Sequence, residues 1–586
     1  MTMSVKAQQA LVPLDIRQVT VGGEIGRRID LTINANLLAI DVEQSFLHPF
    51  RERNRPDGYI GLGKLIDATV RFAAYTADPR VLELKRQLVT EAIDLQEADG
   101  YIGILVPESR LWGVYDIHET SHIVLGLAND YRYFGEQASL AAARKLADYI
   151  LDRWSAEPER IPGPTGKRGN MYGVTTGLDK ALLTLYAQSG EPRYLNFLTD
   201  FPQYRLPEWR TDPKIGYGHM DDERHCYIFM ALCVAQMDLH GLRPDRGLFI
   251  QAHKAIDFLA REDGLLVSGS CSLNEGWHSD QCGAGNTSES CATAYLIRML
   301  DRLLCWEGDP CYGDMMERAI YNALFAAQAP DSRRLRYFSP LEGQRAYYEP
   351  DTFCCPNNFR RIMAELPMMV YYRQGGGVMV NLYTASATSM ELADGLSLTV
   401  RQETDYPNSG DVLLLLEPSG PAAFPLSLRI PRWCTSASVA INNEPLAVTA
   451  EPGKLLVIER TWQAGDRVQL RLPMAFRWIR GRKLQDGKAA LLRGPMLFCI
   501  NPARNEGLAG VDLAELTIDP DSLAGPFDDD TIRLGGQACR VRASSLAAAD
   551  LTLFLSEFPD PGGELTHLKV AASSDLVDDE LIVSVE

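Results

Sequence analysis

The sequence predicts a multidomain α + β protein in which an (α/α)6 barrel over residues 43–374 is followed by antiparallel β-sandwich domains. Three observations predict this class. The chain has 586 residues, and 46% of them are hydrophobic. A chain of this length is longer than a single hydrophobic core usually supports. Its first two-thirds repeat a helical pattern that ends each time in a similar turn. Its last third consists of short alternating apolar runs separated by Gly, Pro and Asn.

The helical repeat is marked by a late aromatic or histidine residue followed by a turn. The marked positions lie roughly 50 to 65 residues apart, at Tyr75, Tyr133, Tyr186, His240 and Trp306. The flanking stretches keep a period of about 3.6 residues, as in TGLDKALLTLYA and CATAYLIRMLDRLL. Five helical hairpins, with a sixth that ends in a helix after Pro356, would close a ring whose loops converge on a central site.

The composition changes near Gly375. Runs such as SLTVRQET, DVLLLLEP and LLVIERTW alternate in polarity and predict a β-sandwich over 375–502. The remaining residues, 503–586, predict a further β-rich segment or second sandwich after an acidic loop. Residues 1–42 contain RQVTVGGEI and RRIDLTI, which we interpret as N-terminal strands that pack on the sandwich region.

The overall charge excludes one class of partner. A net charge of −19 and a pI near 5.1 argue against nucleic acid, which needs a basic surface. No run of about 18 apolar residues and no signal-peptide pattern occurs, so we expect no membrane contact and a cytoplasmic protein. The 12 cysteines should then be free, or bound to metal where they cluster. A homodimer is compatible with these properties.

The adjacent pair Cys354-Cys355 precedes Pro356 and an apolar-periodic stretch. Proline favours the first helical position and an extended residue before it, so we expect an extended Cys355 and a helix that begins near Pro356. Both sulfurs would then lie at the positive end of the helix dipole, which favours thiolate. Two buried structural cysteines, or a strained vicinal disulfide, are the alternatives that the pair alone leaves open.

A second reactive stretch runs from Asn274 to Cys291. Ser288 or Thr287 is expected to cap a helix that begins near Ser290, placing Glu289 and Cys291 at the helix entrance. Glu289, Cys291, Cys354 and Cys355 would make a tetrahedral set suited to Zn²⁺. Their spacing follows no zinc-ribbon pattern, so buried cysteines and a solvated Glu289 are an equally good interpretation of these residues.

Several motifs, taken together, resemble glycoside hydrolase family 127, the β-L-arabinofuranosidase family. They are E-S-C at 289–291, Y-F-S-P-L at 337–341, C-C-P-N-N at 354–358, L-R-I-P-R-W at 428–433 and R-G-P at 493–495. The resemblance extends over roughly residues 45–500. It implies an (α/α)6 barrel followed by β-sandwich domains, in agreement with the fold class above.

The resemblance also implies a retaining mechanism with a zinc-bound cysteine nucleophile. Cys354 would attack the anomeric carbon, with Glu289, Cys291 and Cys355 as the other zinc ligands. Glu275 would be the general acid/base that protonates the leaving oxygen and later activates water. Zinc keeps a coordinated sulfur deprotonated at neutral pH, so the thiolate takes the place of the usual carboxylate nucleophile.

Other residues are candidates for sugar contacts. The resemblance matches two histidines and a tyrosine to pocket positions, namely His122, His225 and Tyr337. Trp277 and His278 could stack on a sugar ring, as could Trp112 and Tyr115. As single residues, all of these are at least as commonly structural.

Two departures from the family pattern fall on expected pocket loops. Gly173-Val174-Thr175-Thr176-Gly177 stands where well-studied members carry a histidine, which makes Thr175 a candidate contact, and Leu273-Asn274-Glu275 replaces H-G-E. Both departures affect which sugar would fit.

We therefore expect an exo-acting glycosidase that removes a terminal L-arabinofuranose or related sugar from a small oligosaccharide or glycoside. Two alternatives remain open. One is a toroid-fold lyase, epimerase or carboxylate-dependent hydrolase with structural zinc, and the other is a non-catalytic carbohydrate-binding protein.

Overall fold

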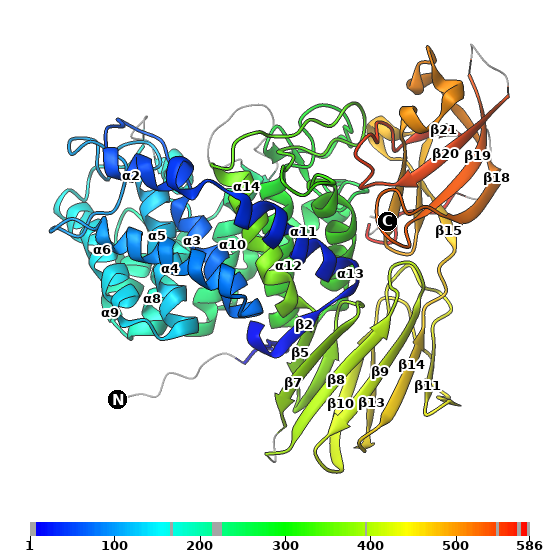
Figure 1. Ribbon diagram of the computed structural model, residues 1–586, viewed down its shortest axis with the longest axis horizontal. Coiled ribbons are helices and arrows are strands. Elements are labelled where there is room, and N and C mark those ends of the chain that lie inside the picture. The colour runs from blue at the N-terminus through cyan, green and yellow to red at the C-terminus, as the bar shows by residue number, and fades with distance from the viewer. Residues whose placement is uncertain are drawn as a thin grey trace. The chain divides into compact units, whose positions relative to one another are not determined.

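The computed structural model describes residues 8–163, 168–213, 225–392, 395–545, 550–570 and 576–582 (Figure 1). The chain divides into two compact units. The first takes the described residues of Met1–Gln8, Leu31–Ala255 and Glu349–Glu365. The second takes those of Gln9–Asp30, Ile256–Tyr348 and Leu366–Glu586.

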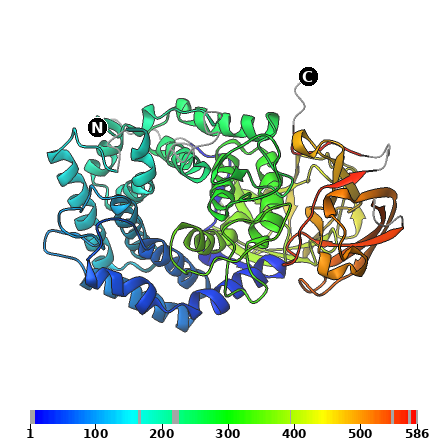
Figure 2. The ribbon, with the colours of Figure 1, turned by 90° about the horizontal axis from the view of Figure 1, so that it is seen from above.

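Helical pairs build the first unit. Three of its helices each pack against the helix that follows: α3 (Leu62–Thr76) against α4 (Pro79–Asp94), α5 (Asp116–Phe134) against α6 (Gln137–Ala156), and α8 (Leu178–Ser189) against α9 (Pro192–Asp200). A lateral row of neighbours runs through α14 (Cys354–Glu365), α3, α5, α8 and α10 (Cys226–Leu242). Figure 2 shows these helices as an inner and an outer row. This is the repeat expected of an α/α toroid, and closure into six hairpins remains a prediction.

The helices end where the repeated turn signals predict. α3, α5 and α8 stop one or a few residues after Tyr75, Tyr133 and Tyr186, and each is followed by a residue with left-handed backbone: Ala77, Gly135 and Gly190. Glycine adopts this conformation without steric cost, which explains the turn after two of the three helices. Asp78 caps the next helix by accepting from the Arg80 amide, with Pro79 at its first position.

The remaining helices complete the list. The first unit also contains α2 (His48–Glu52) and α7 (Arg168–Val174), and α11 spans Ile250–Arg261. The second unit contains α1 (Gly23–Leu31), α12 (Ser290–Glu307) and α13 (Pro310–Ala319). None of the helices that the structure describes is both long and apolar enough to cross a membrane.

The helix after the cysteine pair corrects one expectation. α14 begins at Cys354, so Cys355 is helical rather than extended and Pro356 is the third helical residue. The first four amides of a helix have no intrahelical partner, so a proline there costs no hydrogen bond. The preference for an extended residue before proline is therefore overridden.

Three main sheets build the rest of the second unit. The strand orders are β1-β5-β6-β10-β13, β12-β11-β14-β9-β8-β7-β2 and β15-β16-β17-β20-β19-β18-β21. Pairing is antiparallel except between β6 and β10 and between β18 and β21. A short hairpin, β3 (Ser272–Leu273) with β4 (Gly276–Trp277), stands apart.

The strand bounds show where the third sheet begins. In the first two sheets the strands are β1 (Val12–Pro13), β2 (Val19–Val21), β5 (Tyr371–Gln374), β6 (Gly377–Val380), β7 (Ser386–Glu391), β8 (Ser397–Thr404), β9 (Asp411–Pro418), β10 (Ala422–Arg429), β11 (Ser438–Ile441), β12 (Glu444–Pro445), β13 (Leu455–Trp462) and β14 (Asp466–Arg471). The third sheet uses β15 (Phe476–Arg480), β16 (Lys488–Arg493), β17 (Met496–Ile500), β18 (Thr517–Asp528), β19 (Gln537–Ser544), β20 (Leu551–Glu557) and β21 (Leu568–Val570). The third sheet therefore starts at residue 476 and takes strands from both sides of residue 502.

The N-terminal residues follow the expectation in part. β1 pairs with β5 and β2 with β7, so two early strands join the sheets of the β-rich region. The segment RRIDLTI, in contrast, is not a strand. Most of it belongs to helix α1, where Arg28 donates to Glu24 one turn earlier at 2.7 Å and Ile25 and Ile29 are both buried. The 3.6-residue spacing of these groups outweighs the β-branched composition.

The core of the second unit joins helical and strand segments. Buried side chains from the loops around Leu266 and Leu341 pack with those of β16, β17 and Phe558. Arg429 at the end of β10 is fully buried and forms ion pairs with Asp314 and Glu317 of α13. A buried charge needs such partners, so this contact fixes α13 to the sheet.

Candidate active site

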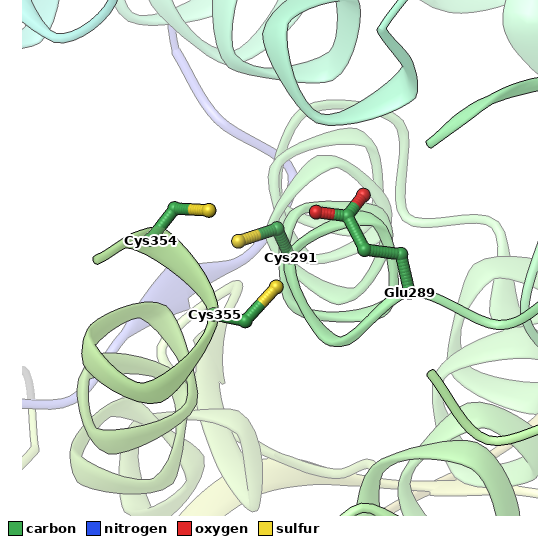
Figure 3. A group of neighbouring side chains, drawn as sticks. All are labelled: Glu289, Cys291, Cys354 and Cys355. Atoms are coloured by element: carbon green, nitrogen blue, oxygen red, sulfur yellow. The ribbon is translucent and has the colours of Figure 1, made fainter. Parts of the chain in front are cut away.

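Four side chains that could hold a metal ion lie together: Glu289, Cys291, Cys354 and Cys355. Their ligand atoms all lie within 4.8 Å of one another, and all four residues are buried. In Figure 3, Cys291 lies near the start of α12 and the cysteine pair at the first turn of α14, with the three sulfurs gathered beside the Glu289 carboxylate. The structure thus brings together the four residues that the sequence predicts as a ligand set.

The loops before α12 hold Glu289 in place. Its amide donates to Ser272 Oγ at 2.8 Å, and the Ser290 amide donates to the Tyr337 carbonyl at 2.9 Å. Glu289 itself is the N-cap residue, with extended backbone. The helix begins at Ser290 as expected, but the cap by Ser288 or Thr287 is wrong, because Glu289 is the N-cap residue and no side chain caps this end. Ser290 Oγ donates to the Arg336 carbonyl at 2.6 Å.

The start of α14 is fixed by polar contacts around Phe353. Asn357 Nδ2 donates to the Phe353 carbonyl at 2.8 Å, and the Phe353 amide donates to the Ile60 carbonyl at 3.0 Å. Phe353 has φ of 73°, which is strained for a bulky residue. The two bonds hold this conformation, and Cys354 follows it directly into the helix. Of the paired cysteines, Cys354 is 9% exposed and Cys355 is 1% exposed.

The donor set fits a zinc ion. Three thiols and a carboxylate are a combination that Zn²⁺ accepts, and its bonds of about 2.0–2.3 Å would place tetrahedral ligands roughly 3.3–3.8 Å apart. The spacing within 4.8 Å comes close to this arrangement before any ligand adjusts. The helix N-termini that carry Cys291 and the cysteine pair also favour the thiolate form.

Glu275 stands at the tip of the β3–β4 hairpin. Asn274 and Glu275 have φ of 47° and 66°, and they link strands paired through Leu273 and Gly276. Positive φ at both central residues is the pattern of a type I′ turn, which Asn tolerates and Glu does not favour. The Tyr337 hydroxyl donates to Glu275 Oε1 at 2.7 Å. Glu275 and Glu289 also form a group with His225 in which ligand atoms lie within 4.8 Å of one another.

His122 lies on α5, 1% exposed, with Nδ1 2.8 Å from the His118 carbonyl oxygen. Its ring packs against Gly177, where a Cβ would lie 2.4 Å from the imidazole. The loop that departs from the family pattern is therefore in contact with His122. Thr175 in that loop is fully buried and donates to the Met171 carbonyl at 2.8 Å, so its hydroxyl is satisfied within the local turn.

Trp277 and His278 are both 2% exposed. Trp277 meets Phe258 edge-on at 5.7 Å, and His278 Nδ1 lies 2.9 Å from Asp280 Oδ1. Burial lowers the pKa of His278 despite the opposing effect of Asp280. Trp112 is 9% exposed and stacks with the Arg160 guanidinium at 4.3 Å. Trp277, His278 and Trp112 are therefore engaged in packing and local hydrogen bonding within the protein.

Sequence reasoning missed two buried polar residues near Cys354. Lys64 of α3 is fully buried, and His118 of α5 is 4% exposed. Burial, helped by the nearby charge of Lys64, lowers the pKa of His118 well below its ordinary value, while Cys354 acts in the opposite direction. His118 stands four residues before His122, on the same helix face, and that spacing is a signal that could have identified it.

Two family models, both of glycoside hydrolase family 127, match consecutive parts of the chain. Residues 50–368 match the family described as "Beta-L-arabinofuranosidase, GH127 catalytic domain". Residues 377–474 match "Beta-L-arabinofuranosidase, GH127 middle domain".

Individual relatives are distant in sequence and similar in fold. A non-reducing end β-L-arabinofuranosidase of Bifidobacterium longum is 23% identical over 508 residues, which cover 76% of this chain and 75% of the relative. A solved GH127 β-arabinofuranosidase has 20% identity and a TM-score of 0.82, covering 96% of this chain and 98% of its own. A GH127 β-L-arabinofuranosidase from Geobacillus stearothermophilus T6 has 23% identity and a TM-score of 0.78, with coverage of 94% and 100%.

Proposed function

Because this chain belongs to glycoside hydrolase family 127 and is a glycoside hydrolase, we propose that it releases a terminal L-arabinofuranose or related sugar with retention of configuration. The names of the B. longum and G. stearothermophilus relatives support L-arabinofuranose as the sugar. The observation that carries the mechanism is the cluster of Glu289, Cys291, Cys354 and Cys355, near the hairpin that presents Glu275.

The four clustered residues would hold one Zn²⁺, and the buried donor set described above supports this assignment. When bound, zinc supplies positive charge that keeps the cysteines deprotonated at neutral pH. Cys354 is the more exposed of the paired cysteines, so it is the better candidate for attack on substrate. Cys355, at 1% exposed, fits a purely ligating role.

The reaction would proceed in two displacements. In the first, Cys354 Sγ forms a bond to the anomeric carbon as the glycosidic bond breaks, and the Glu275 carboxyl gives its proton to the departing oxygen. In the second, the Glu275 carboxylate takes a proton from water, and the water oxygen displaces the sulfur from the anomeric carbon. Two inversions return the original configuration. The Tyr337 hydroxyl, which donates to Glu275, would hold the carboxyl group in position.

His122 and His225 are the best candidates among the remaining side chains for contacts with the sugar. His225 groups with Glu275 and Glu289, and His122 contacts the loop ending at Gly177. Trp277, His278 and Thr175 stay weaker candidates, because each is engaged in local packing or hydrogen bonding.

The direct test combines metal content with turnover. The purified protein should contain one zinc per chain and should hydrolyse 4-nitrophenyl β-L-arabinofuranoside, transferring the sugar to methanol with unchanged anomeric configuration. Cys354→Ser should abolish turnover. Cys311→Ser is a matched control, because burial raises the pKa of that thiol to about 12 and it lies outside the cluster. Full activity in folded Cys354→Ser protein would contradict the mechanism.

A further inference from the structure

Lys64 is an unusual residue for a protein interior. It is fully buried on α3, and its one hydrogen bond to a described residue is to the Tyr227 hydroxyl, at the long distance of 3.5 Å. A protonated lysine amine has three N–H donors, so most of its hydrogen-bonding capacity is unused. Burying such a group without partners is costly, and structures retain it where it has another purpose.

The Glu119 carboxylate on α5 feels the charge of Lys64 but does not complete its hydrogen bonding. The Glu119 carboxylate accepts from the amides of Ile60 at 2.5 Å and Gly61 at 2.7 Å, and among the described residues it forms no ion pair with Lys64. Lys64 Nζ instead lies 5.4 Å from the ring centroids of Tyr59 and of Tyr227. These rings enclose the amine without supplying strong acceptors.

His118 repeats the same pattern from the neighbouring helix. It is 4% exposed, and neither ring nitrogen makes a hydrogen bond of good geometry to a described residue, although the Thr176 backbone lies near enough to raise its pKa slightly. Its ring lies 4.8 Å from that of Tyr59 and 4.7 Å from that of His122. A neutral imidazole offers one hydrogen-bond donor and one acceptor.

The two residues share a location beside the reactive cysteine. Tyr59 contacts both of them, and it also meets Phe353 at 5.5 Å, the residue directly before Cys354. The His118 ring is near enough to Cys354 to be influenced by its charge. Unused polar groups from two helices are thus gathered around one tyrosine next to the proposed nucleophile.

We propose that Lys64 and His118 bind hydroxyl groups of the sugar attached at Cys354 and so determine which sugar is accepted. A sugar hydroxyl both accepts and donates hydrogen bonds, which matches a buried amine and a neutral imidazole. A site built around buried polar groups discriminates strongly against an analogue that lacks the hydroxyl, because the protein groups then stay unpaired. This inference rests on the proposed glycosidase function.

The test couples protein variants to deoxy substrates. The substrates are 4-nitrophenyl β-L-arabinofuranoside and its 2-, 3- and 5-deoxy analogues, and the variants are Lys64→Met and His118→Phe. For the full substrate, each variant should lower kcat/KM by about 10- to 100-fold. For one of the deoxy analogues, the variant and the unmodified protein should be nearly equal, since the contact is already lost.

A thermal-unfolding measurement separates this role from a structural one. Lys64→Met replaces a poorly partnered buried amine with an apolar chain of similar shape, so its midpoint should be unchanged or higher. His118→Phe keeps the ring that packs on Tyr59. It supplies the same substrate comparison if Lys64→Met folds poorly.

The outcomes are distinct. Equal losses on all four substrates, or no loss at all, would overturn the inference while leaving the glycosidase function intact. A lower thermal-unfolding midpoint in Lys64→Met, together with equal losses of kcat/KM on all four substrates, would show that Lys64 has a structural role. If the unmodified protein hydrolyses none of the four substrates and binds no L-arabinose, both the proposed function and this inference fail.

Discussion

The Tyr337 hydroxyl donates a 2.7 Å hydrogen bond to Glu275 Oε1, and Glu275 has the strained φ of 66° at the tip of its hairpin. The two residues lie 62 positions apart in the chain. This side-chain bond helps to orient the proposed acid/base on a short two-stranded support, and strain at such a residue is typical of a functional site.

Removing the Tyr337 hydroxyl should weaken catalysis without unfolding the protein. Hydrogen bonds to charged groups contribute about 1.5–3 kcal/mol, so Tyr337→Phe should lower kcat/KM by roughly 10- to 100-fold. Steady-state kinetics on an aryl furanoside would measure this. Tyr347→Phe is the control, because that hydroxyl bonds the structural residue Arg336 at 2.9 Å. Equal losses in both variants would argue against a role for Tyr337 at Glu275.

Glu275→Gln should show the signature of a lost proton donor. Its loss in kcat/KM should reach about 10²- to 10⁴-fold on substrates with poor leaving groups, such as methyl glycosides. On a 4-nitrophenyl glycoside, which needs little protonation to depart, the first displacement should be affected far less. A burst of nitrophenol followed by slow turnover would support this, and a loss independent of leaving group would contradict it.

The raised pKa of Asp179 should make the free energy of unfolding depend on pH. Burial raises its pKa to about 7, against about 3.9 in an unfolded chain. The folded protein therefore binds more protons between these values, and the contribution of Asp179 to stability is present below about pH 4 and lost as pH rises through 7.

In the unmodified protein, the Lys180 amide donates to Asp179 Oδ1 at 2.6 Å. Asp179→Asn keeps an oxygen that can accept this hydrogen bond, and it removes the charge. The midpoint of the variant, relative to the unmodified protein, should rise by several degrees between pH 5 and pH 8. Thermal unfolding across that range measures it. A difference that does not change with pH would show that Asp179 stays ionised when buried.

The buried ion pair between Asp67 and Arg361 should stabilise the helix that carries the cysteine pair. Arg361 Nε on α14 donates to Asp67 at 2.7 Å, and Arg71 donates to the same carboxylate at 2.9 Å. Although burial alone would raise it, these guanidinium groups hold the pKa of Asp67 well below its usual range.

Arg361→Leu should lower the free energy of unfolding by about 3–5 kcal/mol, because it removes one partner of a buried pair. This contribution should persist at neutral pH and disappear only as pH falls well below 4. The matched control is Arg144→Leu in the exposed pair with Glu191, which should cost about 0–1 kcal/mol. Denaturant unfolding measures both, and comparable values would contradict the prediction.

Metal removal should affect activity and stability together. Dialysis against a chelator should abolish turnover and lower the unfolding midpoint, because a ligand that binds only the folded state stabilises it. Re-addition of Zn²⁺ should restore both, and Co²⁺ should give the absorption of a tetrahedral thiolate site. Full activity in protein shown to be free of metal would contradict the proposed site.

The helix ends could be predicted because their signals are local. Gly135 and Gly190 supply left-handed turns, and Asp78-Pro79 starts a helix, whatever the rest of the chain does. The residues alone left the zinc ligand set and buried structural cysteines equally good, and only the resemblance favoured the ligand set, since Glu289 and Cys354 are distant in sequence and meet only through tertiary packing.

Other features depend on context that a sequence pattern does not contain. Cys355 is helical because a proline in the first turn of a helix costs no hydrogen bond. The Gly23–Leu31 helix forms because its buried residues are spaced as in a helix, although its β-branched residues suggested a strand. Lys64 was missed because a lysine within an apolar-periodic helix is usually solvent-exposed. Only the packing of α3 beside α5 shows that it is buried.

The pairing of β2 with β7 sets an order of events during synthesis. Val19 pairs with Thr388, so about 370 residues must be made before this early strand finds its neighbour. At roughly 5–20 residues per second, the ribosome exposes Val19 for about 20 to 70 seconds before its partner emerges. Strand β2 is thus incorporated long after it is made, once β7 has followed the helices out of the ribosome. A fusion or truncation at this end would act on that later pairing step rather than on the start of synthesis.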